Sequence, residues 1–99
     1  MDLPIQIDQA RIAAFCREHR ITKLALFGSV LTDQFREDSD VDVLVEFDPR
    51  HIPTLLGVVR MDRELSGILG RKADIRTPED LSRHFRDEVV RTALIQYAA

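Results

Sequence analysis

Cysteine and aromatic residues are scarce in this chain, which has one cysteine, no tryptophan and 6% aromatic residues among its 99. A single cysteine, Cys16, excludes an internal disulfide and a metal site made of several thiolates. We therefore expect Cys16 to be a small buried side chain. The apolar content is an ordinary 44%, so a core with so few aromatic rings must be mainly aliphatic.

Long apolar runs and an excess of basic residues are also missing. No stretch approaches the ~20 apolar residues of a membrane-spanning helix, and the start of the chain lacks the basic and apolar segments of a signal peptide. These absences predict a cytoplasmic protein that makes no membrane contact. The net charge of −3 argues against generic nucleic-acid binding through a basic surface.

The length of the chain bounds its organisation. Ninety-nine residues leave room for one core, so we predict that residues 1–99 form a single domain. A chain this short buries roughly two-thirds of its unfolded surface, which predicts modest stability. A homodimer or a larger partner could supply further buried surface, and composition does not choose between them.

Apolar periodicity and turn residues predict a small sheet with several helices. The expected helices run from an N-cap at Asp8 to about His19, from Pro53 in the first turn to a C-cap at Gly70, and from about Phe85 to Tyr97. The expected strands are residues 22–27, 41–47 and 72–76, and Thr77–Asp80 has the residues of a further helix start. This order predicts one α/β domain.

Two of these helices are predicted in more detail. The helix that ends at Gly70 carries a broad apolar face, with Met61 off its main stripe and Asp62 on a solvated charged face. In the last helix the side chains expected to point inward are Phe85, Val89, Ala93, Leu94 and Tyr97. Tyr97 could equally contact a partner.

Residues that suit phosphate and metal chemistry lie at two strand ends. Gly28-Ser29 follows the first strand, where glycine lets backbone approach a ligand and serine offers a hydroxyl and an N–H. Asp40 and Asp42 leave the second strand from the same face, and neighbouring carboxylates repel unless a cation lies between them. Taken singly, Gly28-Ser29 could be an ordinary turn, and the two aspartates a charged strand end.

A third carboxylate joins this pair if the strands at 41–47 and 72–76 lie side by side. Asp74 can then stand beside Asp40 and Asp42, which gives the oxygen ligands that Mg²⁺ prefers and shares with substrate phosphates. Two ions roughly 4 Å apart could activate an attacking oxygen and neutralise a departing pyrophosphate. Asp74 is also placed to act as a general base. The combination predicts transfer of a nucleotidyl group.

The segments around these residues resemble a known family. Gly28-Ser29, Asp40-Val41-Asp42 and Asp74 are similar to the signature of the polymerase-beta-like nucleotidyltransferases, and residues 20–99 resemble its minimal members, the MNT-type antitoxins. The resemblance implies a mixed β-sheet flanked by helices, Mg²⁺ as cofactor and ATP as substrate. It also implies a partner, a HEPN-type toxin ribonuclease, which such antitoxins neutralise by binding and by attaching AMP to a tyrosine.

One motif departs from this family. Its usual Gly-Ser-Arg-x-Arg-Gly is here Gly28-Ser29-Val30-Leu31-Thr32-Asp33, so both phosphate-binding arginines are missing. We expect Arg36 to contribute to the nucleotide site with Gly28 and Ser29. Lys72 and Arg76 either screen the neighbouring acids or compensate for the lost arginines. Loss of one charged contact costs ~1.5–3 kcal/mol of binding.

Three functions therefore stay open at the level of sequence. The first is a Mg²⁺-dependent nucleotidyltransferase that moves AMP from ATP to a hydroxyl of a partner toxin. The second is an antitoxin that neutralises its toxin by binding alone. The third is a nucleotidyltransferase for small molecules such as antibiotics, a class that usually needs a second domain.

Overall fold

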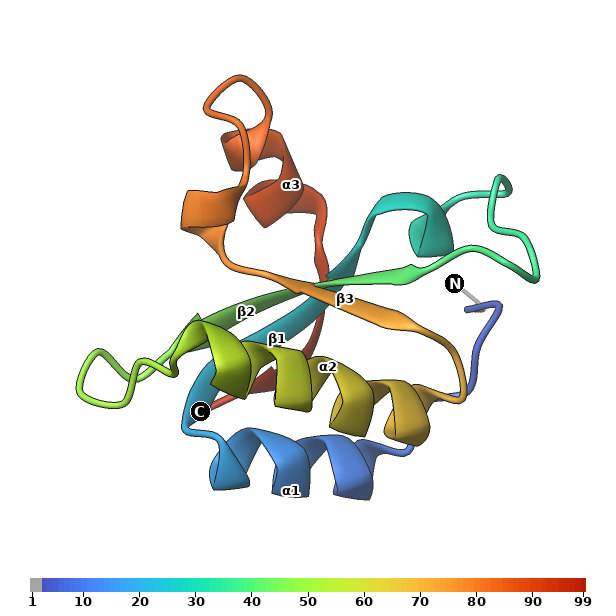
Figure 1. Cartoon of the computed structure of the whole chain (residues 1–99). Helices are drawn as coiled ribbons and strands as arrows, with labels where there is room; N and C mark the ends of the chain where they lie inside the picture. The colour runs from blue at the N-terminus through green and yellow to red at the C-terminus, as the bar shows by residue number, and fades with distance from the viewer. Residues whose placement is uncertain (1–2) are drawn as a thin grey trace.

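A four-stranded sheet with two long helices on one face forms the fold that the computed structural model describes for residues 3–99 (Figure 1). In chain order the elements are α1 (Gln9–Glu18), β1 (Ile21–Phe27), a 3₁₀ turn (Gly28–Leu31), β2 (Val41–Phe47), α2 (Leu55–Leu69), β3 (Ala73–Arg76), a second 3₁₀ turn (Pro78–Asp80), α3 (Arg86–Thr92) and β4 (Leu94–Ala98). The strand order is β3-β2-β1-β4, with β1 antiparallel to both neighbours and β2 parallel to β3. The predicted mixed α/β fold is confirmed.

Local sequence signals set the ends of α1 and α2. The Asp8 carboxylate caps α1, as predicted, by accepting a hydrogen bond from a first-turn N–H at 3.2 Å. Thr54 caps α2 in the same way at 3.1 Å, so Pro53 lies before the helix and not in its first turn. Gly70 ends α2 with a φ of +70°, the left-handed conformation that favours glycine there. Within residues 3–99, no helix is long and apolar enough to cross a membrane.

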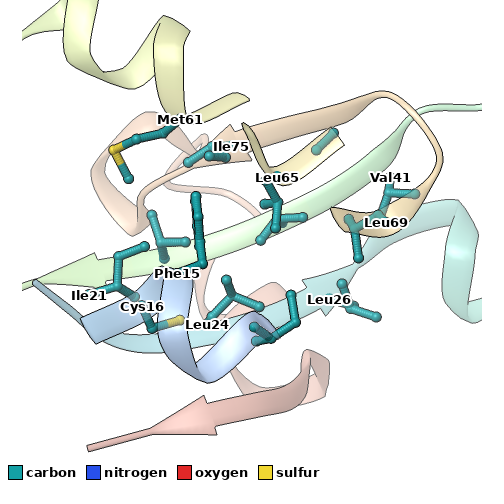
Figure 2. Close-up of a cluster of buried hydrophobic side chains, with 14 of the residues drawn as sticks. Phe15, Cys16, Ile21, Leu24, Leu26, Val41, Met61, Leu65, Leu69 and Ile75 are labelled. Atoms are coloured by element: carbon teal, nitrogen blue, oxygen red, sulfur yellow. The ribbon is translucent and has the colours of Figure 1, made fainter. Parts of the chain in front are cut away.

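The hydrophobic core lies between the sheet and the helices α1 and α2 (Figure 2). Cys16 is fully buried there, and burial raises the pKa of its thiol to about 12, which confirms its structural role. Met61 was expected off the apolar stripe but is 2% exposed and packs in the core. The reason is helical spacing, because Met61, Leu65 and Leu69 recur every four residues and face the sheet together.

The three predicted strands are confirmed to within one residue at each end. At the predicted helix start Thr77 and Asp80 form a capping box, in which the Asp80 carboxylate accepts hydrogen bonds from the Thr77 N–H (3.0 Å) and hydroxyl (3.1 Å). The helical turn that follows is short and spans only Pro78–Asp80.

The predicted helix from Phe85 to Tyr97 is wrong in its second half. α3 ends at Thr92, and the last residues form β4, which pairs with β1. Without β4, one edge of β1 would lack hydrogen-bond partners, and this tertiary requirement overrides the helical pattern. Tyr97 does pack against the core, but from a strand, whereas Phe85 and Leu94 are 48% and 37% exposed.

Candidate active site

Asp42 and Asp74 meet on the outer face of the sheet. β2 and β3 run parallel with Asp42 directly opposite Asp74 in the register. Val41 and Ala73 beside them point into the core, so the two aspartates leave from the opposite face. Asp40 precedes β2 and shares with Asp74 an open cleft of about 540 Å³. The strand pairing that the sequence argument required is therefore present.

The surroundings of Asp42 disfavour its negative charge. Burial is the main cause of the raised pKa of Asp42, and the negative charge of Asp74 raises this pKa further. Arg76 lowers the same pKa, and Asp40 adds a smaller increase. A divalent cation would relieve this repulsion, and three carboxylates supply the hard oxygen ligands that Mg²⁺ prefers. The residues present therefore fit a magnesium site.

A different group of side chains is already gathered at ligand distance. Among residues 3–99, the atoms of Glu18, His19 and Glu64 lie within 4.8 Å of one another, whereas the three aspartates form no group at that distance. His19 Nε2 lies 2.5 Å from Glu64 Oε2, so this contact links the end of α1 to α2 as a hydrogen-bonded pair. The three aspartates share one region of the surface, and closing them around an ion requires side-chain movement.

Two basic side chains pair with these aspartates. Lys72 Nζ lies 3.9 Å from Asp40 Oδ2, and Arg76 donates to Asp74 Oδ2 from Nη2 at 3.1 Å and from Nε at 3.3 Å. All four side chains are substantially exposed, so each pair adds little to stability. These contacts confirm the predicted screening of the acids by Lys72 and Arg76. Their contact with substrate stays a prediction.

Gly28 lies against the carboxylate of Asp42. Its φ is +77°, a conformation that side-chain-bearing residues rarely adopt, and a Cβ at this position would collide with Asp42 Oδ2. Ser29 is half-buried in the 3₁₀ turn that follows, and buried Val30 anchors this turn. The predicted phosphate-binding turn thus lies on the β1 side of Asp42, while Asp74 lies on the β3 side.

Arg36 lies in the loop before Asp40 with its side chain exposed. Its N–H donates to Ser39 Oγ at 2.9 Å, and its carbonyl oxygen accepts a hydrogen bond from Arg71. The charges that shift the pKa of Asp42 do not include that of Arg36. A nucleotide contact by Arg36 stays a prediction, and it would require the exposed side chain to reach toward the site.

Arg71 organises the loop before Asp40, and the sequence argument missed it. Its Nη2 donates to the carbonyl oxygens of Arg36 and Glu37, both at 2.5 Å. Its guanidinium also lies 4.6 Å from the centre of the Phe35 ring, a cation–π contact. Arg71 and Arg36 are 35 residues apart in the chain, so no local pattern reveals this contact.

Two side chains of α2 fix the outer edge of β3. Ser66 Oγ accepts a hydrogen bond from the Ala73 N–H at 2.8 Å, and Asp62 Oδ1 accepts one from the Ile75 N–H at 3.0 Å. These bonds satisfy two edge donors and hold the backbone on both sides of Asp74. Asp62 was expected on a solvated face but is half-buried, and burial raises its pKa. The overlooked signal is the i,i+4 spacing of Asp62 and Ser66 beside the buried stripe.

Sequence comparisons identify relatives over most of the chain. A family model described as a nucleotidyltransferase domain matches residues 10–97. A relative from Methanocaldococcus jannaschii, provisionally named a protein adenylyltransferase, is 30% identical over 84 residues, which are 85% of this chain and 88% of the relative. The protein adenylyltransferase MntA of Thermococcus cleftensis is 32% identical over 71 residues, which cover 72% of this chain and 70% of MntA.

Solved structures share the same architecture. One that is provisionally described as a minimal nucleotidyltransferase has a TM-score of 0.71 at 35% identity, covering 87% of this chain and 86% of the other. A toxin–antitoxin structure with AMP-PNP has a TM-score of 0.73 at 17% identity, covering 94% of this chain and 75% of the other. At 17% identity this second likeness concerns the fold alone.

Proposed function

The chain belongs to the nucleotidyltransferase domain family, and from that premise we propose that it is a protein adenylyltransferase that acts as an antitoxin. It transfers AMP from ATP to a hydroxyl, that of a tyrosine, on a HEPN-type toxin in the cytoplasm, with residues 1–99 as one minimal domain. The observation that carries the proposal is Asp42 opposite Asp74 with Gly28 against Asp42. Relatives named protein adenylyltransferases and the toxin–antitoxin structure with AMP-PNP support it.

Each residue of the site has its own task in this proposal. Gly28 and Ser29 bind the triphosphate through the backbone and the serine hydroxyl. Asp40, Asp42 and Asp74 would hold Mg²⁺, with two ions when nucleotide is bound, and the bound metal would supply positive charge to balance the phosphates and the departing pyrophosphate. Asp74 also orients the acceptor hydroxyl and accepts its proton.

In this proposal the two substrates approach the aspartates from opposite flanks. Gly28 lies on the β1 side of Asp42 and Asp74 on the β3 side, so the phosphates approach from one flank and the acceptor from the other. The acceptor oxygen forms a bond to the α-phosphorus of ATP, and the bond from that phosphorus to pyrophosphate breaks. The proton of the hydroxyl passes to Asp74 and then to solvent.

Label transfer tests this function. The purified protein is incubated with Mg²⁺, ATP labelled at the α-phosphate, and the HEPN-type toxin that the proposal names as its partner. We expect the label on the partner, and a loss of roughly 100-fold or more in Asp42→Asn and Asp74→Asn. Asp33→Asn, on an exposed loop, is the matched control and should keep the activity. A folded sample that transfers no label at any ATP concentration rejects the proposal.

Neutralisation by binding alone is the second candidate function. The observation that favours it is the turn Gly28–Leu31, which has no basic side chain to hold the triphosphate. The double variant Asp40→Asn, Asp42→Asn separates the two functions. If it neutralises the toxin as well as the wild type does, binding is sufficient. If it forms the complex but no longer neutralises, transfer is required.

A further inference from the structure

The beginning of α2 exposes large apolar side chains that the fold does not use. Leu55, Leu56 and Val59 are 83%, 63% and 44% exposed, and Ile52, just before the helix, is 66% exposed. We call these four residues the apolar patch. The later part of α2 differs from its beginning, because its apolar residues are buried against the sheet. A gathering of exposed apolar side chains on so small a protein marks a contact surface.

The apolar patch borders a groove that ends at the candidate active site. This groove has a volume of about 900 Å³ and lies between α2, the end of β2 and the segment from β3 to the second 3₁₀ turn. Figure 1 shows how α2 starts after the loop that follows β2 and then runs beside β3. Ile52, Leu55 and Val59 line the groove together with Asp74. The patch and the proposed proton acceptor therefore face the same space.

The acidic side chains that line the groove indicate what kind of ligand it binds. Five acids line it, and one base. The acids are Glu46, Asp62, Asp74, Glu79 and Asp80, and the base is Arg76. An acidic rim repels phosphate and attracts lysine and arginine side chains. The groove is therefore unsuited to the triphosphate, and it suits a polypeptide that carries an apolar anchor with basic neighbours.

On the basis of the proposed function, we propose that this groove binds the acceptor segment of the partner protein. An apolar side chain of the partner packs on Ile52, Leu55 and Val59, basic side chains of the partner face the acidic rim, and the acceptor hydroxyl reaches Asp74. Gly28 and the triphosphate lie on the other flank of Asp42, so nucleotide and acceptor do not compete for space. The acceptor is thus a protein segment with an apolar anchor and positive charge.

Leu55→Asp tests this assignment. Leu55 is 83% exposed, so the substitution should leave the fold intact, which circular dichroism checks. Ile95→Asp, at a 52% exposed position on the opposite edge strand β4, is the matched control. Calorimetry measures binding of the purified HEPN-type toxin proposed as partner and, separately, of AMP-PNP with Mg²⁺. We expect Leu55→Asp to weaken partner binding at least tenfold and to leave AMP-PNP binding within twofold, while Ile95→Asp changes neither.

Two further variants test the apolar patch and the acidic rim separately, and both are milder changes that are expected to leave the fold intact. Leu55→Ser should weaken partner binding in the same direction by a smaller factor. Glu79→Gln should weaken it at low salt, and this difference should disappear at high salt because the attraction is screened. A Glu79→Gln effect that is independent of salt contradicts the charge argument.

The other outcomes are distinguishable. If the wild type binds and labels its partner and Leu55→Asp does so equally, the groove assignment is wrong and the proposed function stands. If the wild type neither binds nor labels the partner, both fail. A loss of AMP-PNP affinity in Leu55→Asp assigns the groove to the nucleotide, and a wild-type dimer that Leu55→Asp dissociates assigns it to a second copy. Either result overturns the inference.

Discussion

Asp42 and Asp74 are direct partners in the parallel register of β2 and β3, although the whole of α2 separates them in the chain. Their carboxylates leave the same face of the sheet, on the side away from the hydrophobic core. Packing of the core therefore does not explain why either residue is charged. Two like charges placed in this way destabilise the protein, and Arg76 offsets the repulsion only in part, because the pKa of Asp42 stays raised. The arrangement is typical of a site whose function and stability oppose each other.

Asp42→Asn should stabilise the protein when no metal is present. Asparagine removes both the cost of burying the charge and its repulsion with Asp74. The free energy of unfolding should therefore rise by ~0.2–1 kcal/mol at pH 7. Because the folded-state pKa of Asp42 is raised, this penalty is absent well below its ordinary value of 3.8 and complete above the raised value. The gain should therefore shrink as the pH falls toward 4. Urea unfolding in EDTA measures it, with Asp33→Asn as the control, and a destabilised Asp42→Asn contradicts the prediction.

Arg76→Gln should strengthen the binding of the metal alone. Arg76 holds Asp74 Oδ2 in an exposed ion pair, and a cation must compete with it for that oxygen. Exposed pairs contribute ~0–1 kcal/mol, so Mg²⁺ affinity without nucleotide should increase by up to about fivefold. Arg91→Gln, on the last turn of α3, is the control. If Arg76→Gln weakens ATP binding and leaves Mg²⁺ binding unchanged, Arg76 contacts the nucleotide instead.

Gly28→Ala and Gly67→Ala should have opposite effects. At Gly28 the positive φ and the contact with Asp42 make alanine unfavourable, with a loss of at least ~1 kcal/mol in unfolding free energy and displacement of the Asp42 carboxylate. Gly67 lies within α2 with open space around its position, so alanine there should stabilise by ~0.5–1 kcal/mol. Thermal unfolding compares the two variants. Equal effects at both positions would show that Gly28 makes no close approach.

Asp62→Ala should destabilise β3, whereas Asp62→Asn should not. The alanine variant leaves the Ile75 N–H without its acceptor, at a cost of about 1–3 kcal/mol. Asparagine keeps an acceptor oxygen at the same place and removes a charge whose pKa burial raises. Hydrogen exchange of the Ile75 amide should therefore accelerate in Asp62→Ala only. Similar exchange in both variants would mean that the carboxylate does not hold this edge.

The sequence was sufficient to predict β2 and the placement of Asp74 beside Asp42, because both depend on the alternation of side chains along strands. Asp40, Asp42 and Asp74 required only the correct pairing of two short segments, and the capping residues of α1 and α2 are likewise local signals. The segment after Thr92 could not be assigned in this way. Its residues suit a helix, and the free edge of β1 decides that they form a strand.

Long-range side-chain contacts were also beyond the sequence. Arg71 donates hydrogen bonds to backbone carbonyl oxygens of a loop that is distant in the chain. Every residue has such an oxygen, so the sequence does not reveal which ones Arg71 contacts. Asp62 was expected to be solvated because charged residues precede and follow it in the helix. The adjacent strand β3 nevertheless buries the Asp62 side chain in part. These contacts position the candidate site, and only the tertiary structure brings them together.

Binding of Mn²⁺, used in place of Mg²⁺ with AMP-PNP and followed by electron paramagnetic resonance, tests the shared cation site most directly. Asp40→Asn, Asp42→Asn and Asp74→Asn should each weaken Mn²⁺ binding by roughly tenfold or more. Glu64→Gln, in the other group of potential ligands, should leave it unchanged. Full Mn²⁺ affinity in Asp74→Asn, or its loss in Glu64→Gln, would contradict a site built from the three aspartates.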